Sequence, residues 1–170
     1  TSYTARVYAK NSHGTSAASE ASASFTPLPE VIDGLFQTTL WDGTGSSQTI
    51  TNNINISGKG GLVWIKRRSG TSDHNLLDSA RGFATSGAYL LSSNTTGASN
   101  SFADYFNANS TGFTLLHSGN DTNASGSEYV SWTFRKQPKF FDVVKYDSSS
   151  GNVTNFGSAG ATVNHNLGSV

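Results

Sequence analysis

The residue types best suited to catalysis gather in the stretch GGLVWIKRRSGTSDHNLLDSARG, between positions 60 and 82. Asp73 and His74 stand close to Ser69 and Ser72, and these are the groups of a hydrolase triad. A triad draws its groups from separate elements and sets its nucleophile on a strained turn, whereas the chain has no G-x-S-x-G sequence. Adjacent residues of a strand also point to opposite faces, so Asp73 and His74 cannot orient one another. We therefore expect no enzyme here.

The same stretch has an architectural interpretation, which we favour. GLVWIKRR predicts a core strand with a charged exit, and SGTSD predicts a hairpin loop. Further along, we expect Asp78 to pair with Arg81 or to accept backbone hydrogen bonds at a turn. The three cations at 66–68 would suit phosphate contacts, but 11 Lys and Arg balance 11 Asp and Glu, so the chain has no basic field. We expect no nucleic-acid partner.

A second candidate is a metal site in DTNASGSE, residues 121–128. Asp121, Asn123 and Ser125 have the alternating oxygen ligands of a calcium loop, but the twelfth position is Trp132 where an EF-hand requires Glu. A lectin-type calcium site on these three residues is one interpretation, and a plain Asn/Gly turn between strands is the one we favour. The four histidines have no metal-ligand spacing, so we expect no cofactor.

A third candidate is a sugar-binding surface formed by Tyr89, Tyr105 and Phe106. Their rings lie in or beside Ser/Asn/Gly-rich stretches and could stack on sugar rings while neighbouring amides supply hydrogen bonds. The alternative is that they are core residues, because aromatic residues in strands usually pack inward.

The elements that would position these residues are strands. Charged residues make up 13% of the chain and aromatic residues 11%, and Ser, Thr, Gly and Asn are abundant, which is typical of a loop-rich all-β protein. There is no cysteine and no apolar run long enough to span a membrane. The spacing of short strands and turns predicts an antiparallel β-sandwich of the jelly-roll kind. We expect its strands at 35–41, 48–56, 62–68, 75–79, 88–92, 103–107, 113–117 and 128–136. In the last strand we expect Val130, Trp132 and Phe134 to face inward.

Partial β modules are expected on both sides of this sandwich. Residues 1–27 alternate and turn like a hairpin, residues 28–34 contain two prolines and predict a linker, residues 35–137 form the sandwich, and residues 138–170 begin another β module with a strand in KFFDVVKYD. The absence of methionine and the unpartnered strands suggest a piece of a longer chain.

Two resemblances follow from these motifs. The pattern Y-x-A-R-V-Y-A-x-N-x-x-G-x-S is similar to the last two strands of a fibronectin type III domain. The blocks GGLVWIKRRSGTSDHNLLDSARG, GFTLLHSGNDTNASGSEYVSWTFRK and PKFFDVVKYD…HNLG resemble the concanavalin A-like domain, laminin G-like or SPRY-like, of virion and tail proteins of marine tailed phages.

The second resemblance implies a non-enzymatic structural or adhesion module at the virion surface, in a tail fibre or other appendage, with host surface glycan as a ligand. A scaffolding role without a ligand is also compatible with it. The alternative is a carbohydrate-binding or adhesion module of a secreted or cell-surface bacterial protein. The resemblance points to a homotrimer among other virion proteins, and the polar, weakly charged strands are compatible with close contact between chains. The other possibility is a monomeric module in a string.

Overall fold

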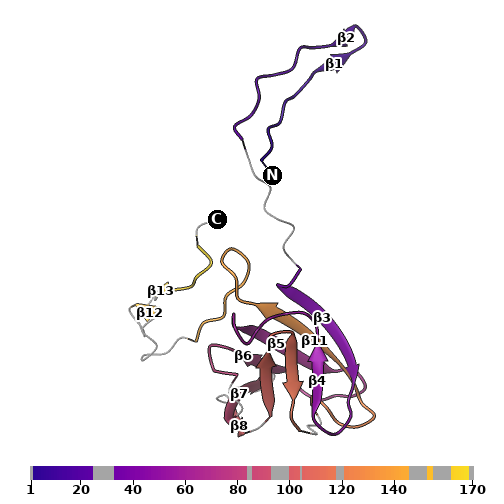
Figure 1. Cartoon of the computed structure of the whole chain (residues 1–170), viewed down its shortest axis with the longest axis vertical. Helices are drawn as coiled ribbons and strands as arrows, with labels where there is room; N and C mark the ends of the chain where they lie inside the picture. The colour runs from indigo at the N-terminus through magenta and orange to yellow at the C-terminus, as the bar shows by residue number, and fades with distance from the viewer. Residues whose placement is uncertain are drawn as a thin grey trace. The chain divides into compact units, whose positions relative to one another are not determined.

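The computed structural model describes residues 2–24, 33–83, 86–92, 100–103, 105–117, 121–145, 153–154 and 162–168. These residues form strands and connections with no helix among them, and the strands pair antiparallel, which confirms the all-β prediction. None of them forms a helix that could cross a membrane. The chain divides into two compact units, Thr1–Val31 and Ile32–Val170 (Figure 1).

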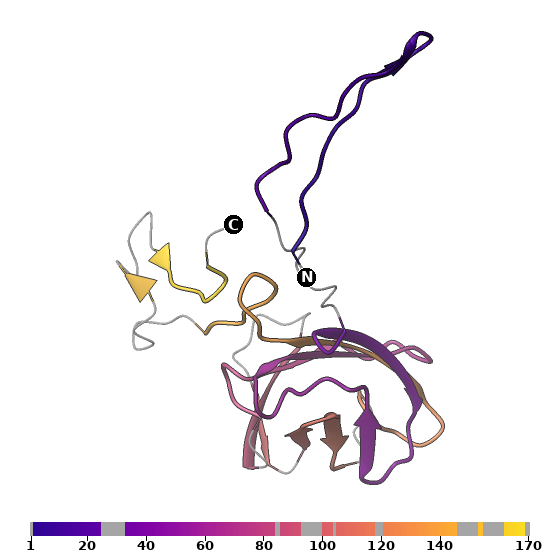
Figure 2. The same cartoon turned by 45° about the horizontal axis from the view of Figure 1, so that its top comes forward.

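The larger unit contains two facing sheets, and Figure 2 shows the larger sheet arching over the smaller one. The larger sheet has six strands in the order β3 (Phe36–Asp42), β11 (Glu128–Arg135), β5 (Gly61–Arg67), β6 (Asn75–Asp78), β7 (Ser86–Ser92) and β8 (Asn100–Ala103). The smaller sheet has three, in the order β4 (Gln48–Thr51), β10 (Gly112–Leu115) and β9 (Phe106–Asn109). Most of these strands agree with the predicted ones within a few residues. The prediction for 48–56 extended beyond β4, which ends at Thr51, and the prediction for 103–107 merged parts of β8 and β9.

The core lies between the two sheets. Every second residue of β5 faces it, so Val63 and Ile65 are completely buried. The remaining core side chains come from both layers and from the β4–β5 connection: Trp41, Ile50, Ile54, Ile56, Leu77, Phe106, Phe113, Leu115 and Tyr129. Each large apolar side chain removed from water in this way contributes about 1.5–3 kcal/mol to folding.

The facing of β11 is the reverse of the predicted one. Tyr129, Ser131 and Thr133 are completely buried and face the smaller sheet, so Trp132 and Phe134 lie on the opposite face. The small side chains at 131 and 133 suit the inner face because large rings from the smaller sheet already fill the core. Thr133 also accepts a hydrogen bond across the core from Nδ2 of Asn52, at 2.9 Å.

The segment after β11 also differs from the prediction. No strand forms over the described residues of KFFDVVKYD; the chain instead makes a tight turn with an isolated bridge between Gln137 and Phe141. Lys139 takes a positive φ of 64° in this turn, which a continuous strand could not include. Further along, β12 (Val153–Thr154) pairs with β13 (Thr162–Val163).

The smaller unit is a hairpin whose ladder is limited to β1 (Lys10–Asn11) and β2 (Gly14–Thr15). Away from the turn, hydrogen bonds between the two halves of the hairpin involve every second residue of the first half and every third residue of the second half. A serine occupies each third position, and its Oγ accepts a hydrogen bond from the opposite N–H at 2.9–3.0 Å: Ser16 from Ala9, Ser19 from Val7, and Ser22 from Ala5. The hairpin expected for this segment is present, but its large apolar side chains are not buried within the chain, since Tyr3, Val7 and Tyr8 are 51–73% exposed.

Candidate functional site

The outer face of the six-stranded sheet carries several large apolar side chains. Strand register places them in rows across β3, β11, β5 and the start of β6. One row contains Leu40, Val130 and Lys66; the next contains Thr38, Trp132, Trp64 and Leu76; a third contains Phe36, Phe134 and Leu62. We call this set the outer face.

Aromatic rings on the outer face pack against one another. The rings of Trp64 and Trp132 are directly opposite on neighbouring strands, with centroids 5.4 Å apart and planes at 59°. The ring of Phe134 packs against two others. Its centroid lies 4.8 Å from that of Phe36 and 5.1 Å from that of Phe141, which belongs to the turn after β11. Such pairs add about 0.5–1.5 kcal/mol beyond the area they bury.

Polar groups beside the two tryptophans are partly fixed. Nε1 of Trp64 donates a hydrogen bond of 2.8 Å to Nδ1 of His74, so the proton of the neutral imidazole lies on Nε2. Nζ of Lys66 donates to the carbonyls of Arg67, Gly70 and Ser72 at 2.7–3.3 Å, which ties it to the β5–β6 loop.

Trp132 differs from Trp64 in its indole N–H. In the part of the chain that the structure describes, no group accepts a hydrogen bond from Nε1 of Trp132, and this atom is not shut off from solvent. The side chain is only partly buried. The outer face therefore combines a ring available for stacking with an N–H available for donation, which is what a hydroxyl-rich ring ligand requires.

The three aromatic residues proposed from the sequence do not form a common exposed surface. Phe106 is completely buried and stacks on Phe113 at 5.3 Å, so no face of its ring is open to a sugar. Tyr105 packs against the core, and its hydroxyl is 2.7 Å from Oγ1 of Thr122. For these two residues the core alternative holds. Tyr89 lies in β7, and its side chain is outside the described residues.

The pKa of Tyr105 reflects this position. Burial of its hydroxyl raises the pKa, and the nearby carboxylate of Asp121 adds to the increase, while the hydrogen bond with Thr122 opposes it. The net shift is upward, so the phenol stays neutral as a structural group.

Two of the three candidate calcium ligands, Asn123 and Asp121, form hydrogen bonds with other parts of the chain instead. Asn123 is completely buried; its Oδ1 accepts from the backbone N–H of Thr44 at 3.1 Å, and its Nδ2 donates to the carbonyl of Ser46 at 2.6 Å. Its side-chain oxygen is therefore already used, while Ser125 is exposed. Asp121 contributes its backbone carbonyl to Nδ2 of Asn75 at 3.4 Å. Among the described residues no group of three His, Cys, Asp or Glu could hold a metal.

Close packing supports this structural role for the loop. A Cβ at Gly43 would lie 2.2 Å from the carbonyl oxygen of Ala124 and 2.8 Å from the ring of Tyr129. The favoured interpretation, a turn between two strands, agrees with the observed connection between β10 and β11.

The stretch at 60–82 has the predicted architecture. β5 enters the core, residues 68–74 form the loop, and the buried Asp78 accepts a backbone hydrogen bond from Arg81 at 2.9 Å and pairs with its guanidinium. His74 accepts the hydrogen bond from the indole N–H of Trp64. Asp73 lies in the loop between β5 and β6.

Sequence reasoning missed Trp64, Trp132 and His74 as neighbours. The alternation in EYVSWTFR shows that 130, 132 and 134 share a face, but not which face is inner. The pairing of Trp132 with Trp64 depends on strand order, which neither strand reveals alone.

Comparison with known proteins gives one match. The family model described as "Domain of unknown function (DUF7483)" covers residues 33–170, which is most of the chain. No curated protein and no solved structure matches the chain.

Proposed function

We propose that this chain, which belongs to the DUF7483 family, a domain of unknown function, is a non-enzymatic adhesion module that binds glycan on the outer face. The observation that carries this proposal is the pair of Trp64 and Trp132 on the solvent side of the six-stranded sheet. Strands hold both rings rigidly, so stacking on them costs little conformational entropy.

The setting is proposed from the resemblance of the sequence to phage virion domains. It is a surface-exposed virion appendage such as a tail fibre, outside the cell, where copies of the chain associate as a trimer beside other virion proteins. The different-class candidate is a carbohydrate-binding module of a secreted or cell-surface bacterial protein. Mass spectrometry of purified virions distinguishes the two, since only the first requires the chain in the particle.

Glycan binding is tested with Trp132→Thr, which removes the ring and keeps a β-branched residue suited to a strand. On a glycan array, wild-type protein should bind at least one glycan, and this variant should lose about tenfold or more in affinity, the range of one lost aromatic contact. Tryptophan fluorescence should change when the glycan is added.

The matched control is Tyr8→Thr, which also replaces an aromatic residue by Thr. Tyr8 is 59% exposed and belongs to the hairpin, not to the outer face, so its replacement should leave affinity nearly unchanged. Equal affinity of Trp132→Thr and wild type, or no binding to any glycan, would reject the proposal and leave scaffolding as the role.

A further inference from the structure

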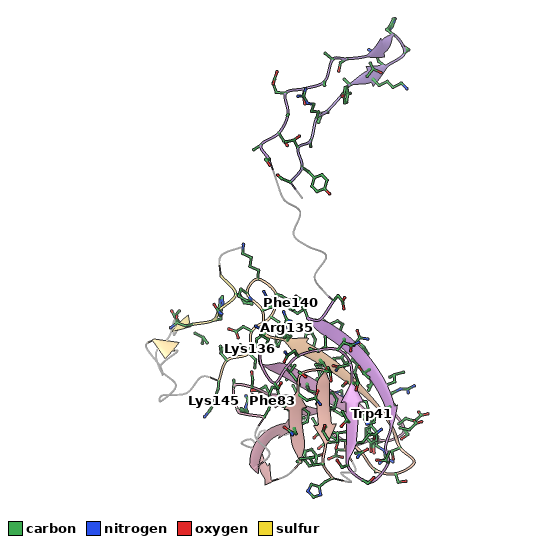
Figure 3. All side chains as sticks on the ribbon, in the orientation of Figure 1. Trp41, Phe83, Arg135, Lys136, Phe140 and Lys145 are labelled. Carbon is green, nitrogen blue, oxygen red and sulfur yellow. The ribbon has the colours of Figure 1, made fainter. Side chains whose placement is uncertain are left out.

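A pocket of about 130 Å³ opens at the end of β11, next to the outer face. Phe141 lines this pocket and also stacks on Phe134 of the outer face, with ring planes 25° apart. The pocket and the outer face therefore share an aromatic wall. Figure 3 shows Arg135, Lys136 and Phe140 together at this end of the sheet, with Trp41 at the other end.

Two lysines and one aspartate set the charge of the pocket. The carboxylate of Asp142 accepts hydrogen bonds from Nζ of Lys136 at 2.8 Å and from the backbone N–H groups of Asn166 and Val143 at 2.7 and 2.9 Å. Burial raises the pKa of Asp142, but these hydrogen bonds together lower the pKa by more than burial raises it. The net shift of the pKa is therefore downward, and the group is ionised at neutral pH. Asp142 thus compensates one lysine only.

The second lysine, Lys59, lines the same pocket and is exposed. Among the residues that the structure describes, it has no carboxylate partner within ion-pair distance. The backbone N–H of Lys136 donates to the carbonyl of Gly60 at 2.9 Å, which holds Lys59 beside the end of β11. The pocket therefore has a net charge of about +1 at neutral pH.

The hydrogen-bond acceptors of Gln137 and Asp142 in the pocket lining are already in use. Oε1 of Gln137 accepts a hydrogen bond of 3.2 Å from Nη2 of Arg135, which leaves the Nε2 amide group to donate. The oxygens of Asp142 are engaged as described. Lys59, Lys136 and Gln137 all line the pocket, and their side chains carry the N–H groups that pair with an anionic oxygen.

We propose that this pocket takes the carboxylate of an acidic sugar whose chain continues along the outer face. The proposal rests on the proposed glycan-binding function and adds its chemical class: a uronate-type glycan, bound by stacking on the aromatic rings and by charge at Lys59. A neutral glycan can occupy the rings but leaves the lysine unpaired.

Calorimetry with tetragalacturonate and its fully methyl-esterified counterpart tests this, because esterification removes the charge and keeps the sugar chain. Wild-type protein should bind the acid about tenfold or more tightly than the ester, and added salt should reduce the difference. Lys59→Gln should bring the two affinities to within about twofold by weakening only the acid. This exposed substitution should leave the melting temperature unchanged.

Lys139→Gln is the matched control, since Lys139 is exposed, lies three residues from Lys136 and is outside the pocket lining. It should keep the preference for the acid. Equal affinity of wild type for acid and ester, or a preference that survives Lys59→Gln, overturns the acidic class while glycan binding stands. If neither probe binds wild type and the glycan array is also negative, the proposal falls together with the function on which it rests.

Discussion

The hairpin and the sandwich are both antiparallel β structure, but different forces hold them. In the hairpin, Val7 and Tyr8 are 73% and 59% exposed, so its apolar side chains bury little surface within this chain. In the sandwich, Phe106 and Phe113 are completely buried and stack on one another. The hairpin depends on hydrogen bonds, and the sandwich adds a core.

Hydrogen bonds alone provide little net stability, because water competes for the same groups. A typical one contributes about 0.5–1.5 kcal/mol net, and exposed ones contribute least. Two strands without a core are marginal in water. The comparison predicts that matched substitutions have large effects in the sandwich and small ones in the hairpin.

The largest difference is expected for loss of an aromatic ring. Phe113→Ala should reduce the free energy of unfolding by about 3–5 kcal/mol, since it removes buried surface and leaves a cavity. Tyr8→Ala in the hairpin should change it by less than about 0.5 kcal/mol. Urea denaturation followed by tryptophan fluorescence measures both, and similar losses in the two variants would contradict the comparison.

An intermediate difference is expected for loss of a polar side chain. Asn123→Ala removes a completely buried side chain that accepts from the N–H of Thr44 and donates to the carbonyl of Ser46, and it should cost about 1–3 kcal/mol in total. In Ser19→Ala, water can replace the lost bond to Val7, because both residues are exposed.

Hydrogen exchange separates these two outcomes. Asn123→Ala should lower protection throughout the sandwich, whereas Ser19→Ala should increase exchange only near Val7. A global loss of protection in Ser19→Ala would show that the hairpin supports the sandwich.

The smallest difference is expected in how stability changes as the pH is lowered. The folded-state pKa of Asp142 is below the ordinary value of 3.8, so its contribution to stability is present above pH 3.8 and is lost as the pH falls through the folded-state pKa. Asp142→Asn should therefore be less stable than wild type at neutral pH, and the gap should close in acid. Denaturation midpoints measured across this range test the convergence. A gap for Asp142→Asn that does not vary with pH would contradict the assignment.

Local patterns in the sequence were sufficient for the class of fold and for most strands. Alternation and Gly/Asn turns located β3, β5 and β11, and GLVWIKRR was correctly assigned to the core. The turn at Asp78 and Arg81 also followed from local spacing, because its two partners are three residues apart.

Features that depend on distant contacts could not be predicted in this way. β11 has apolar residues on one face and Tyr129 with small residues on the other, so hydrophobicity alone selects the wrong inner face. The rings that fill the core opposite Ser131 come from the smaller sheet. Likewise, the role of Asn123 depends on Thr44 and Ser46, about 80 positions earlier in the chain.

The pairing of β3 with β11 has a mechanical consequence. These are the first and last strands of the six-stranded sheet in chain order, and the N–H of Arg135 donates to the carbonyl of Leu35 at 2.8 Å, so the chain enters and leaves the sheet at one end. The hydrogen bonds between antiparallel strands run across the strand direction. Tension applied through the two flanking segments would thus load these bonds one after another, as in a zipper, and would open the sheet at lower force than shear on all of them at once.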